Sequence, residues 1–238
     1  MDIVLHPIGV LHSPYREKFI VPRQPGLVSS ITAELELLPP YHQPETVREL
    51  EQFSHLWLLF QFHQTATQGW QPTVRPPRLG GNTRVGVYAS RSPFRPNPIG
   101  LSVVELDEVR CDGPVPILIV RGADLIDGTP IVDIKPYIPY SDAIPDARGG
   151  FASQPPPRTM LVHFGDQALQ QIAADHSRYP DLQQQISELL SADPRPAYRQ
   201  TQEDNREYGA LLHDYNIRWK VAGQRVFVTG IDPVEDRD

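Results

Sequence analysis

The chain has 238 residues, a formal net charge of −7 and a single cysteine. Its length suits one large domain, or a large domain and a small one, and a hydrophobic fraction of 39% excludes a wholly disordered chain. Cys111 alone can form neither an internal disulfide nor a cysteine-based metal cluster, which favours a cytoplasmic location. No basic start followed by an apolar run is visible, and no stretch approaches the ~18 apolar residues of a membrane span. We therefore expect neither a secretory signal nor a membrane span.

Short apolar segments separated by prolines and glycines dominate the first 150 residues. The 26 prolines favour short elements and long ordered loops. One helix is expected over residues 44–53, with a proline near its first turn. Because the strands are closely spaced and do not alternate with helices, we predict a mainly β domain over residues 1–150, with a spacing that suits a barrel or a sandwich. The expected strands cover residues 3–12, 28–38, 54–63, 84–90, 99–111, 115–125 and 131–138.

The chain changes character after residue 149. The segment GGFASQPPPR (149–158) has the composition of a linker. Apolar residues at helical spacing predict helices over 166–175 and 180–191, and a third helix is expected over 203–213. Residues 215–231 read as a β-hairpin that turns at Ala222 and Gly223. We therefore predict a small α+β domain over residues 159–238.

Charge is distributed unevenly along the sequence. Residues 52–104 contain no aspartate or glutamate and five arginines, so this window carries +5 and the remaining chain −12. Such a window is typical of a site for phosphate, carboxylate or a nucleic-acid backbone. The alternative is a basic face that pairs with the acidic remainder. The arginines are Arg75, Arg78, Arg84, Arg91 and Arg95.

Three short motifs contain residue types that are typical of a binding site. In RSPFRPNP (91–98), prolines hold two guanidinium groups, an aromatic ring and an amide at low entropic cost. This set suits an adenine ring together with a carboxylate or phosphate. The segment VPRQPG (21–26) has the same design, and the turn at Asp127 and Gly128 presents a carboxylate to hydroxyl groups such as those of a ribose. The plainer alternatives are a rigid linker and an ordinary hairpin turn.

Other signatures are weaker or missing. The segments DPRPAYR (193–199) and HDYNIRW (213–219) contain arginine, tyrosine and tryptophan, which suit stacking on unpaired bases or a packed core. His55 and His63 share one strand face but are too few to predict a metal site, so no metal is expected. No GxGxxG motif or P-loop is present, which disfavours a Rossmann sheet.

Long stretches of the sequence resemble one family. They are PIGVLHSPYREKFIVPRQPGLV, FSHLWLLFQFHQ, RPPRLGGNTRVGVYASRSPFRPNPIGLSVVEL, DLIDGTPIVDIKPYIPY, DPRPAYR and LHDYNIRW. The chain resembles the TsaA/TrmO family of S-adenosylmethionine-dependent tRNA methyltransferases over nearly its whole length. The resemblance implies methylation of N6 of N6-threonylcarbamoyladenosine at tRNA position 37, an N-terminal β-barrel that binds S-adenosylmethionine, and a homodimer. The alternatives are a non-catalytic sensor of S-adenosylmethionine or a nucleotide, and a tRNA-binding adaptor.

The resemblance also implies site residues at the matching positions. No general base is assigned, and Asp214 and His63 are the candidates. The expected contacts to the substrate or tRNA are Arg95, Arg195, Tyr198, Asp214 and Asn216. The expected contacts to the cofactor are Arg23, Gln24, Pro25, Gly26, His63, Gln64, Arg91, Leu101, Asp127, Gly128, Thr129 and Pro130.

Overall fold

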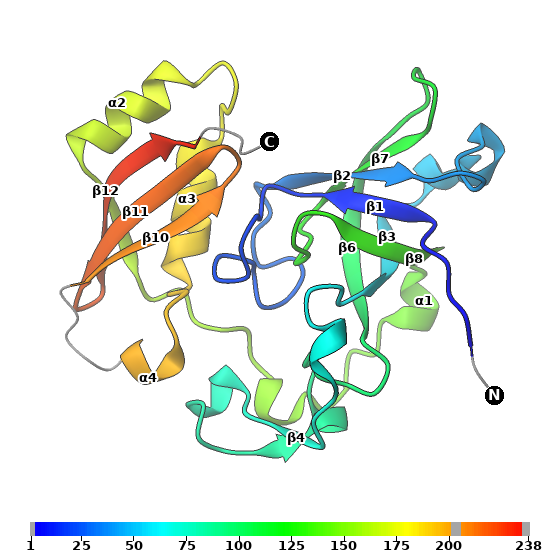
Figure 1. The fold of residues 1–238 in the computed structure, drawn as a ribbon, viewed down its shortest axis with the longest axis horizontal. Coiled ribbons are helices and arrows are strands. Elements are labelled where there is room, and N and C mark those ends of the chain that lie inside the picture. Colours follow the sequence, from blue (N-terminus) through cyan, green and yellow to red (C-terminus); the bar gives the residue numbers. More distant parts are fainter. Residues whose placement is uncertain (1–2, 201–205, 235–238) are drawn as a thin grey trace.

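The structure is a computed structural model that describes residues 3–200 and 206–234. Its N-terminal part is a closed barrel in which each strand pairs antiparallel with its neighbours, in the order β1-β2-β7-β6-β3-β8 (Figure 1). This confirms the expected mainly β fold with an N-terminal barrel. The barrel strands are β1 (Gly9–His12), β2 (Thr32–Leu37), β3 (His55–Gln61), β6 (Ile99–Arg110), β7 (Ile117–Arg121) and β8 (Thr129–Pro136).

Alternating side chains fill the barrel. On β3 the side chains of Leu56, Leu58 and Phe60 are buried, whereas the residues between them are more exposed. Because successive strand residues point to opposite faces, one face of β3 lies inside the barrel. The inward side chains pack with Leu35 and Val120 from β2 and β7 in one apolar cluster. The inward face of β3 therefore forms part of the barrel core.

Several of the expected N-terminal elements are wrong in detail. The strand expected over 3–12 is only β1 (Gly9–His12), and the strand expected over 115–125 is only β7 (Ile117–Arg121). The helix expected over 44–53 is two separate 3-10 turns, η1 (Pro44–Val47) and η2 (Leu50–Gln52). Glu49 lies between them with φ of 67°, a left-handed conformation that interrupts a helix. The strand expected over 84–90 shrinks to β5 (Val85–Gly86), which pairs with β4 (Thr73–Val74). The other short helices of this region are η3 (Ala66–Gln68), η4 (Pro77–Leu79), η5 (Val87–Ala89), α1 (Pro139–Asp142) and η6 (Gly150–Ala152).

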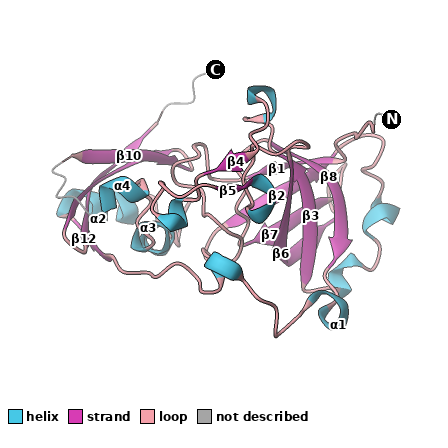
Figure 2. Cartoon of the chain, turned by 90° about the horizontal axis from the view of Figure 1, so that it is seen from below, coloured by secondary structure: helices cyan, strands magenta, loops and turns pink. Residues whose placement is uncertain are grey.

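The C-terminal part is a four-stranded sheet of order β10-β11-β12-β9 with helices packed on it (Figure 2). This confirms the α+β expectation. The antiparallel pair β11 and β12 forms the expected hairpin, and β9 joins parallel to β12. No helix in the described ranges is long and apolar enough to cross a membrane. The elements are β9 (Leu161–Phe164), α2 (Asp166–Ala174), α3 (Leu182–Ser191), α4 (Ala197–Gln200), β10 (Glu207–Leu212), β11 (Tyr215–Ala222) and β12 (Arg225–Pro233).

The third helix expected over 203–213 is wrong where the structure describes the chain. Residues 207–212 form β10, which pairs antiparallel with β11. Ala210 and Leu212 are buried and their neighbours are more exposed, which is the alternation of a strand. Residues 201–205 of that expected helix lie outside the described residues.

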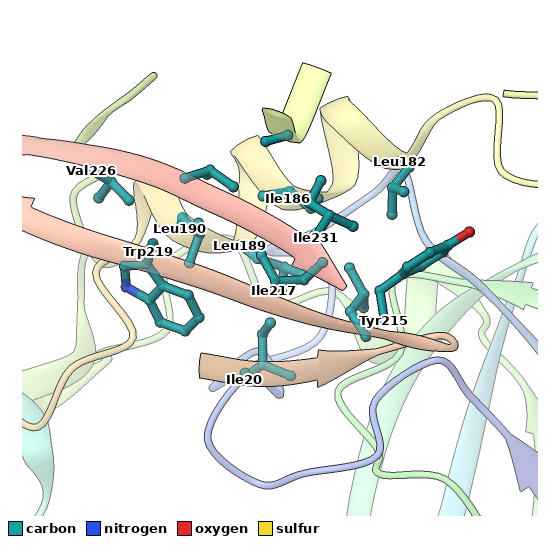
Figure 3. Close-up of a cluster of buried hydrophobic side chains, with 14 of the residues drawn as sticks. Ile20, Leu182, Ile186, Leu189, Leu190, Tyr215, Ile217, Trp219, Val226 and Ile231 are labelled. Atoms are coloured by element: carbon teal, nitrogen blue, oxygen red, sulfur yellow. The ribbon is translucent and has the colours of Figure 1, made fainter. Parts of the chain in front are cut away.

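The connection between β1 and β2 (residues 13–31, the β1–β2 loop) packs into the C-terminal core. Tyr15, Ile20, Val28 and Ile31 are buried in the same cluster as the apolar faces of α3 and β11, and Figure 3 shows Ile20 among those side chains. Tyr15 also forms an isolated antiparallel bridge with Leu212 of β10. An early segment of the chain therefore completes the C-terminal core, and the expected division of the chain at residues 150–159 stays a prediction.

Candidate functional site

A cavity of about 460 Å³ lies at one end of the barrel. Its lining includes the last residues of β3, the first residues of β6, and the segment between β7 and β8. Because these strands are antiparallel neighbours, those segments meet at the same end of the barrel. Parts of the β1–β2 loop and of the proline-rich loop 91–98 complete the wall. This volume lies within the range of small-molecule sites, roughly 300–1,000 Å³.

Seven of the expected cofactor residues line this pocket. The guanidinium of Arg91 donates from Nη1 to Oε1 of Gln24 at 2.7 Å, which joins the two proline-bracketed loops. Arg95, expected to contact tRNA, also lines the pocket and donates from Nη1 to the carbonyl oxygens of Ser90 at 3.1 Å and Ser92 at 3.3 Å. The seven are Arg23, Gln24, His63, Gln64, Arg91, Leu101 and Thr129.

The remaining expected cofactor residues, Pro25, Gly26, Asp127, Gly128 and Pro130, are outside the pocket lining. Oδ1 of Asp127 accepts a hydrogen bond from the backbone N–H of Ser13 at 3.0 Å. The Asp127 N–H donates to the carbonyl of Tyr15 at 2.9 Å. The turn therefore fixes the start of the β1–β2 loop against the barrel.

Apolar side chains at the end of β3 and at the start of β6 form one wall of the pocket. Phe60 and Phe62 lie edge to face with ring centroids 5.1 Å apart. A Cβ added to Gly100 would overlap the Phe60 ring, so glycine is required for this close approach. Leu101, whose side chain is exposed, extends the same wall.

Three ionisable groups in the pocket, Arg23, His63 and Asp124, have shifted pKa values, and burial lowers the pKa of Arg23. Burial lowers the pKa of His63 below its ordinary value, which keeps the imidazole neutral at neutral pH. Burial also raises the pKa of Asp124 from 3.8 to about 6, although a hydrogen bond from Ser102 and the charge of Arg91 oppose the shift. Oγ of Ser102 donates to Oδ1 of Asp124 at 2.6 Å.

Sequence reasoning missed Asp124. It lies near the end of a segment that was expected to be a strand through residue 125, whereas β7 stops at Arg121 and Asp124 faces the pocket. A carboxylate next to the apolar residues of a buried strand was the available signal, because such groups are rarely buried without a function or a partner.

Among the expected C-terminal site residues whose side chains the structure describes, none lines the pocket: these are Arg195, Asp214 and Asn216. Arg195 is buried and forms a two-point ion pair with Asp193, Nε to Oδ1 and Nη2 to Oδ2 both at 2.8 Å. The carbonyl of Arg195 accepts from Nη2 of Arg23 at 3.4 Å, so this ion pair supports one wall of the pocket from behind. The burial of the guanidinium does not fit direct contact with tRNA.

Asp214 and Asn216 lie at the start of β11. The carboxylate of Asp214 accepts a hydrogen bond from the Tyr179 hydroxyl at 2.8 Å and pairs with Arg178. Asn216 is partly buried in β11 beside Gly209. The side chain of Tyr198, in α4, lies outside the described residues. Within the described part of the chain, no group of three or more acidic, histidine or cysteine side chains could hold a metal ion.

Comparison with known proteins identifies the family. A model of the tRNA-methyltransferase O N-terminal domain matches residues 10–143, and a model of the TrmO C-terminal domain matches residues 157–234. The chain belongs to the TrmO family. This confirms the resemblance found in the sequence.

Relatives of the TrmO family match nearly the whole chain. A tRNA (adenine(37)-N6)-methyltransferase of Escherichia coli K12 is 54% identical over 226 residues, which is 95% of this chain and 96% of that protein. A putative S-adenosylmethionine-dependent methyltransferase of Pseudomonas aeruginosa is 48% identical over 217 residues and 90% of each chain. The crystal structure of TrmO from P. aeruginosa superposes with a TM-score of 0.80 at 39% identity and covers 98% of both chains.

Proposed function

We propose that this chain transfers a methyl group from S-adenosylmethionine to N6 of adenine 37 of tRNA, and that the adenine carries a threonylcarbamoyl group. One observation carries the proposal: the barrel-end pocket gathers seven of the residues expected to bind the cofactor, in a chain 54% identical to a tRNA (adenine(37)-N6)-methyltransferase. The resemblance further supports a homodimer, and a tRNA substrate supports action in the cytoplasm.

The residues of the pocket fit S-adenosylmethionine. Phe60 and Ile99 offer apolar surface for an adenine ring, and the guanidinium of Arg91 suits the carboxylate of the methionyl group. The amide groups of Gln24 and Gln64 can pair with hydroxyl or amino groups. When bound, S-adenosylmethionine supplies a methyl group on a positively charged sulfur.

The main task of the protein in this reaction is to position its ligands. Orientation of two reactants can lower a barrier by several kcal/mol, and the Arg91–Gln24 hydrogen bond holds two walls of the pocket in a fixed relation. The N6 proton must leave at or near the transfer step. His63 lines the pocket and has a lowered pKa, so its neutral imidazole can accept that proton. Asp214, the other candidate base, does not line the pocket of its own chain.

The arginine-rich window offers a surface for the tRNA. Arg75 and Arg78 are exposed beside β4 and η4, and the side chains of Trp70 and Tyr88 are 54% and 77% exposed. Cationic and aromatic side chains on one segment suit a phosphate backbone and unpaired bases. We therefore place the anticodon loop against this segment, with the target base entering the pocket.

A transfer assay tests the proposed function. The protein is incubated with methyl-labelled S-adenosylmethionine and with tRNA that either carries or lacks the threonylcarbamoyl group. Labelling of the modified tRNA alone is expected, and Arg91→Ala should reduce it because a pocket guanidinium is lost. Arg148→Ala is the matched control, since Arg148 is exposed and outside the pocket.

Two results of this assay would refute the proposal. Binding of S-adenosylmethionine without transfer to either tRNA would indicate a sensor. Binding of tRNA without affinity for S-adenosylmethionine would indicate an adaptor. Labelling of both tRNAs would retain the methyltransferase and reject the threonylcarbamoyl group as a requirement.

A further inference from the structure

The pocket has an unbalanced set of charges. Its lining contains four cationic side chains, and Asp124 is the one carboxylate among the described residues that line it. Arg23, Arg91 and Arg95 each donate to a carbonyl or amide oxygen. A ligand with a carboxylate is therefore attracted to this pocket, whereas a positively charged part of a ligand is favoured only near Asp124. The fourth cation is Lys18.

Asp124 is held in a fixed position. It follows β7 and precedes Leu125, which is buried in the barrel core, and Oδ1 accepts the 2.6 Å hydrogen bond from the buried hydroxyl of Ser102 on β6. Two barrel segments therefore fix the carboxylate at the pocket surface. A charge held this way needs no reorganisation when a ligand binds, and a low-dielectric wall strengthens its effect.

The charged groups of S-adenosylmethionine differ in the partners that they need, and this difference indicates which group lies next to Asp124. The methionyl carboxylate suits the arginines, and the methionyl ammonium has three N–H donors that carbonyl and amide oxygens can satisfy. The sulfonium has no N–H or O–H group, so its positive charge is balanced chiefly by a nearby negative charge. We infer that Asp124 is the counter-ion of the sulfonium of S-adenosylmethionine. The inference rests on the proposed function and adds the residue that distinguishes the cofactor from its product.

Methyl transfer changes the partner of Asp124. The methyl–sulfur bond breaks, a methyl–N6 bond forms, and the electron pair of the broken bond remains on the sulfur, which becomes a neutral thioether. The N6 proton leaves to a base, so total charge is conserved. Asp124 then faces a neutral sulfur, and the pocket holds S-adenosylhomocysteine less tightly than S-adenosylmethionine. Asp124 therefore promotes exchange of product for fresh cofactor.

Calorimetry with both ligands tests this assignment. Asp124→Asn removes the charge and keeps an oxygen that can accept from Ser102. At about pH 7.5, above the pKa of Asp124, we expect this variant to bind S-adenosylmethionine at least about ten-fold more weakly and to change affinity for S-adenosylhomocysteine less than about two-fold. Asp133→Asn is the matched control, because Asp133 is on the same barrel and outside the pocket. It should change neither affinity.

The two ligands separate a charge effect from a damaged pocket. An equal loss for both ligands, or no loss for either, would overturn the inference while leaving the proposed function in place. If the unaltered chain binds neither ligand, the proposed function itself fails. Ser102→Ala serves as a second variant, because it retains the charge of Asp124 and removes the hydrogen bond that holds the carboxylate in place. We expect a smaller loss of affinity, confined to S-adenosylmethionine. An equal loss of affinity for both ligands counts against the inference.

Discussion

The charge of Asp124 should reduce the stability of the folded chain, so Asp124→Asn should stabilise it at neutral pH. Burial raises the pKa of this carboxyl from 3.8 to about 6. A shift of about 2 pKa units corresponds to about 3 kcal/mol between the two protonation states. Asparagine resembles the neutral acid in shape and can still accept from Ser102. We therefore expect a gain in the free energy of unfolding approaching about 3 kcal/mol.

The expected gain in stability from Asp124→Asn depends on pH. Well below pH 4 the carboxyl is neutral in both the folded and the unfolded chain, so the charge costs nothing. As the pH rises from about 4 to about 6, the unfolded chain ionises first, and the cost of ionising the buried group grows to its full value. The gain from Asp124→Asn should therefore be near zero at the acidic end and constant above about pH 6.

Urea denaturation of the two proteins side by side measures this gain. Differences between the variants at each pH cancel the titration of all other groups, and equal slopes against urea support the comparison. A variant that is less stable than the unaltered chain at neutral pH, or a gain that is the same at all pH values, would refute the reasoning. Improved stability together with weaker binding of S-adenosylmethionine would make Asp124 a site where stability is sacrificed for function.

Three further predictions concern other parts of the molecule. Gly100→Ala should lower the free energy of unfolding by about 1–3 kcal/mol and weaken cofactor binding, because the added methyl group overlaps the Phe60 ring; denaturation and calorimetry measure the two effects. Arg195→Ala should cost about 3–5 kcal/mol in the same denaturation assay, because it leaves Asp193 without the partner of a buried ion pair; a loss of tRNA affinity with unchanged stability would contradict this. If the exposed arginines outside the pocket, Arg75, Arg78 and Arg84, contact phosphates, the logarithm of tRNA affinity should fall against the logarithm of salt with a slope of about −2 in a filter-binding titration, whereas a flat response would exclude them from the tRNA interface.

Local patterns in the sequence predicted the short strands and the two proline-bracketed loops of the pocket, whereas the resemblance to the TrmO family implied the barrel and the other pocket residues. The prolines around Arg23 and Arg91 are a short-range signal that marks loops of fixed shape. The structure brings these two loops together through the Arg91–Gln24 hydrogen bond. The side chains by which these two loops line the pocket therefore lie within the sequence motifs themselves.

Other features depend on contacts between distant segments. The segment of β10 was mistaken for a helix, although Ala210 and Leu212 alternate with more exposed neighbours in the pairing with β11. The short strand β9 was missed because its parallel pairing with β12 leaves no local mark. The place of Asp124 in the pocket could not be predicted, because it depends on closure of the barrel, which brings Asp124 next to Ser102, twenty-two positions earlier in the chain.

The β1–β2 loop has a thermodynamic consequence for the whole chain. One part of this loop, from Lys18 to Gln24, lines the pocket, and Ile20 within it is buried against the C-terminal helices and strands. A ligand that orders the pocket wall must also favour the folded C-terminal core, and by linkage the folded core must raise the affinity for that ligand by the same factor. The β1–β2 loop thus joins the pocket wall and the C-terminal core in one packed unit, so their stabilities are linked.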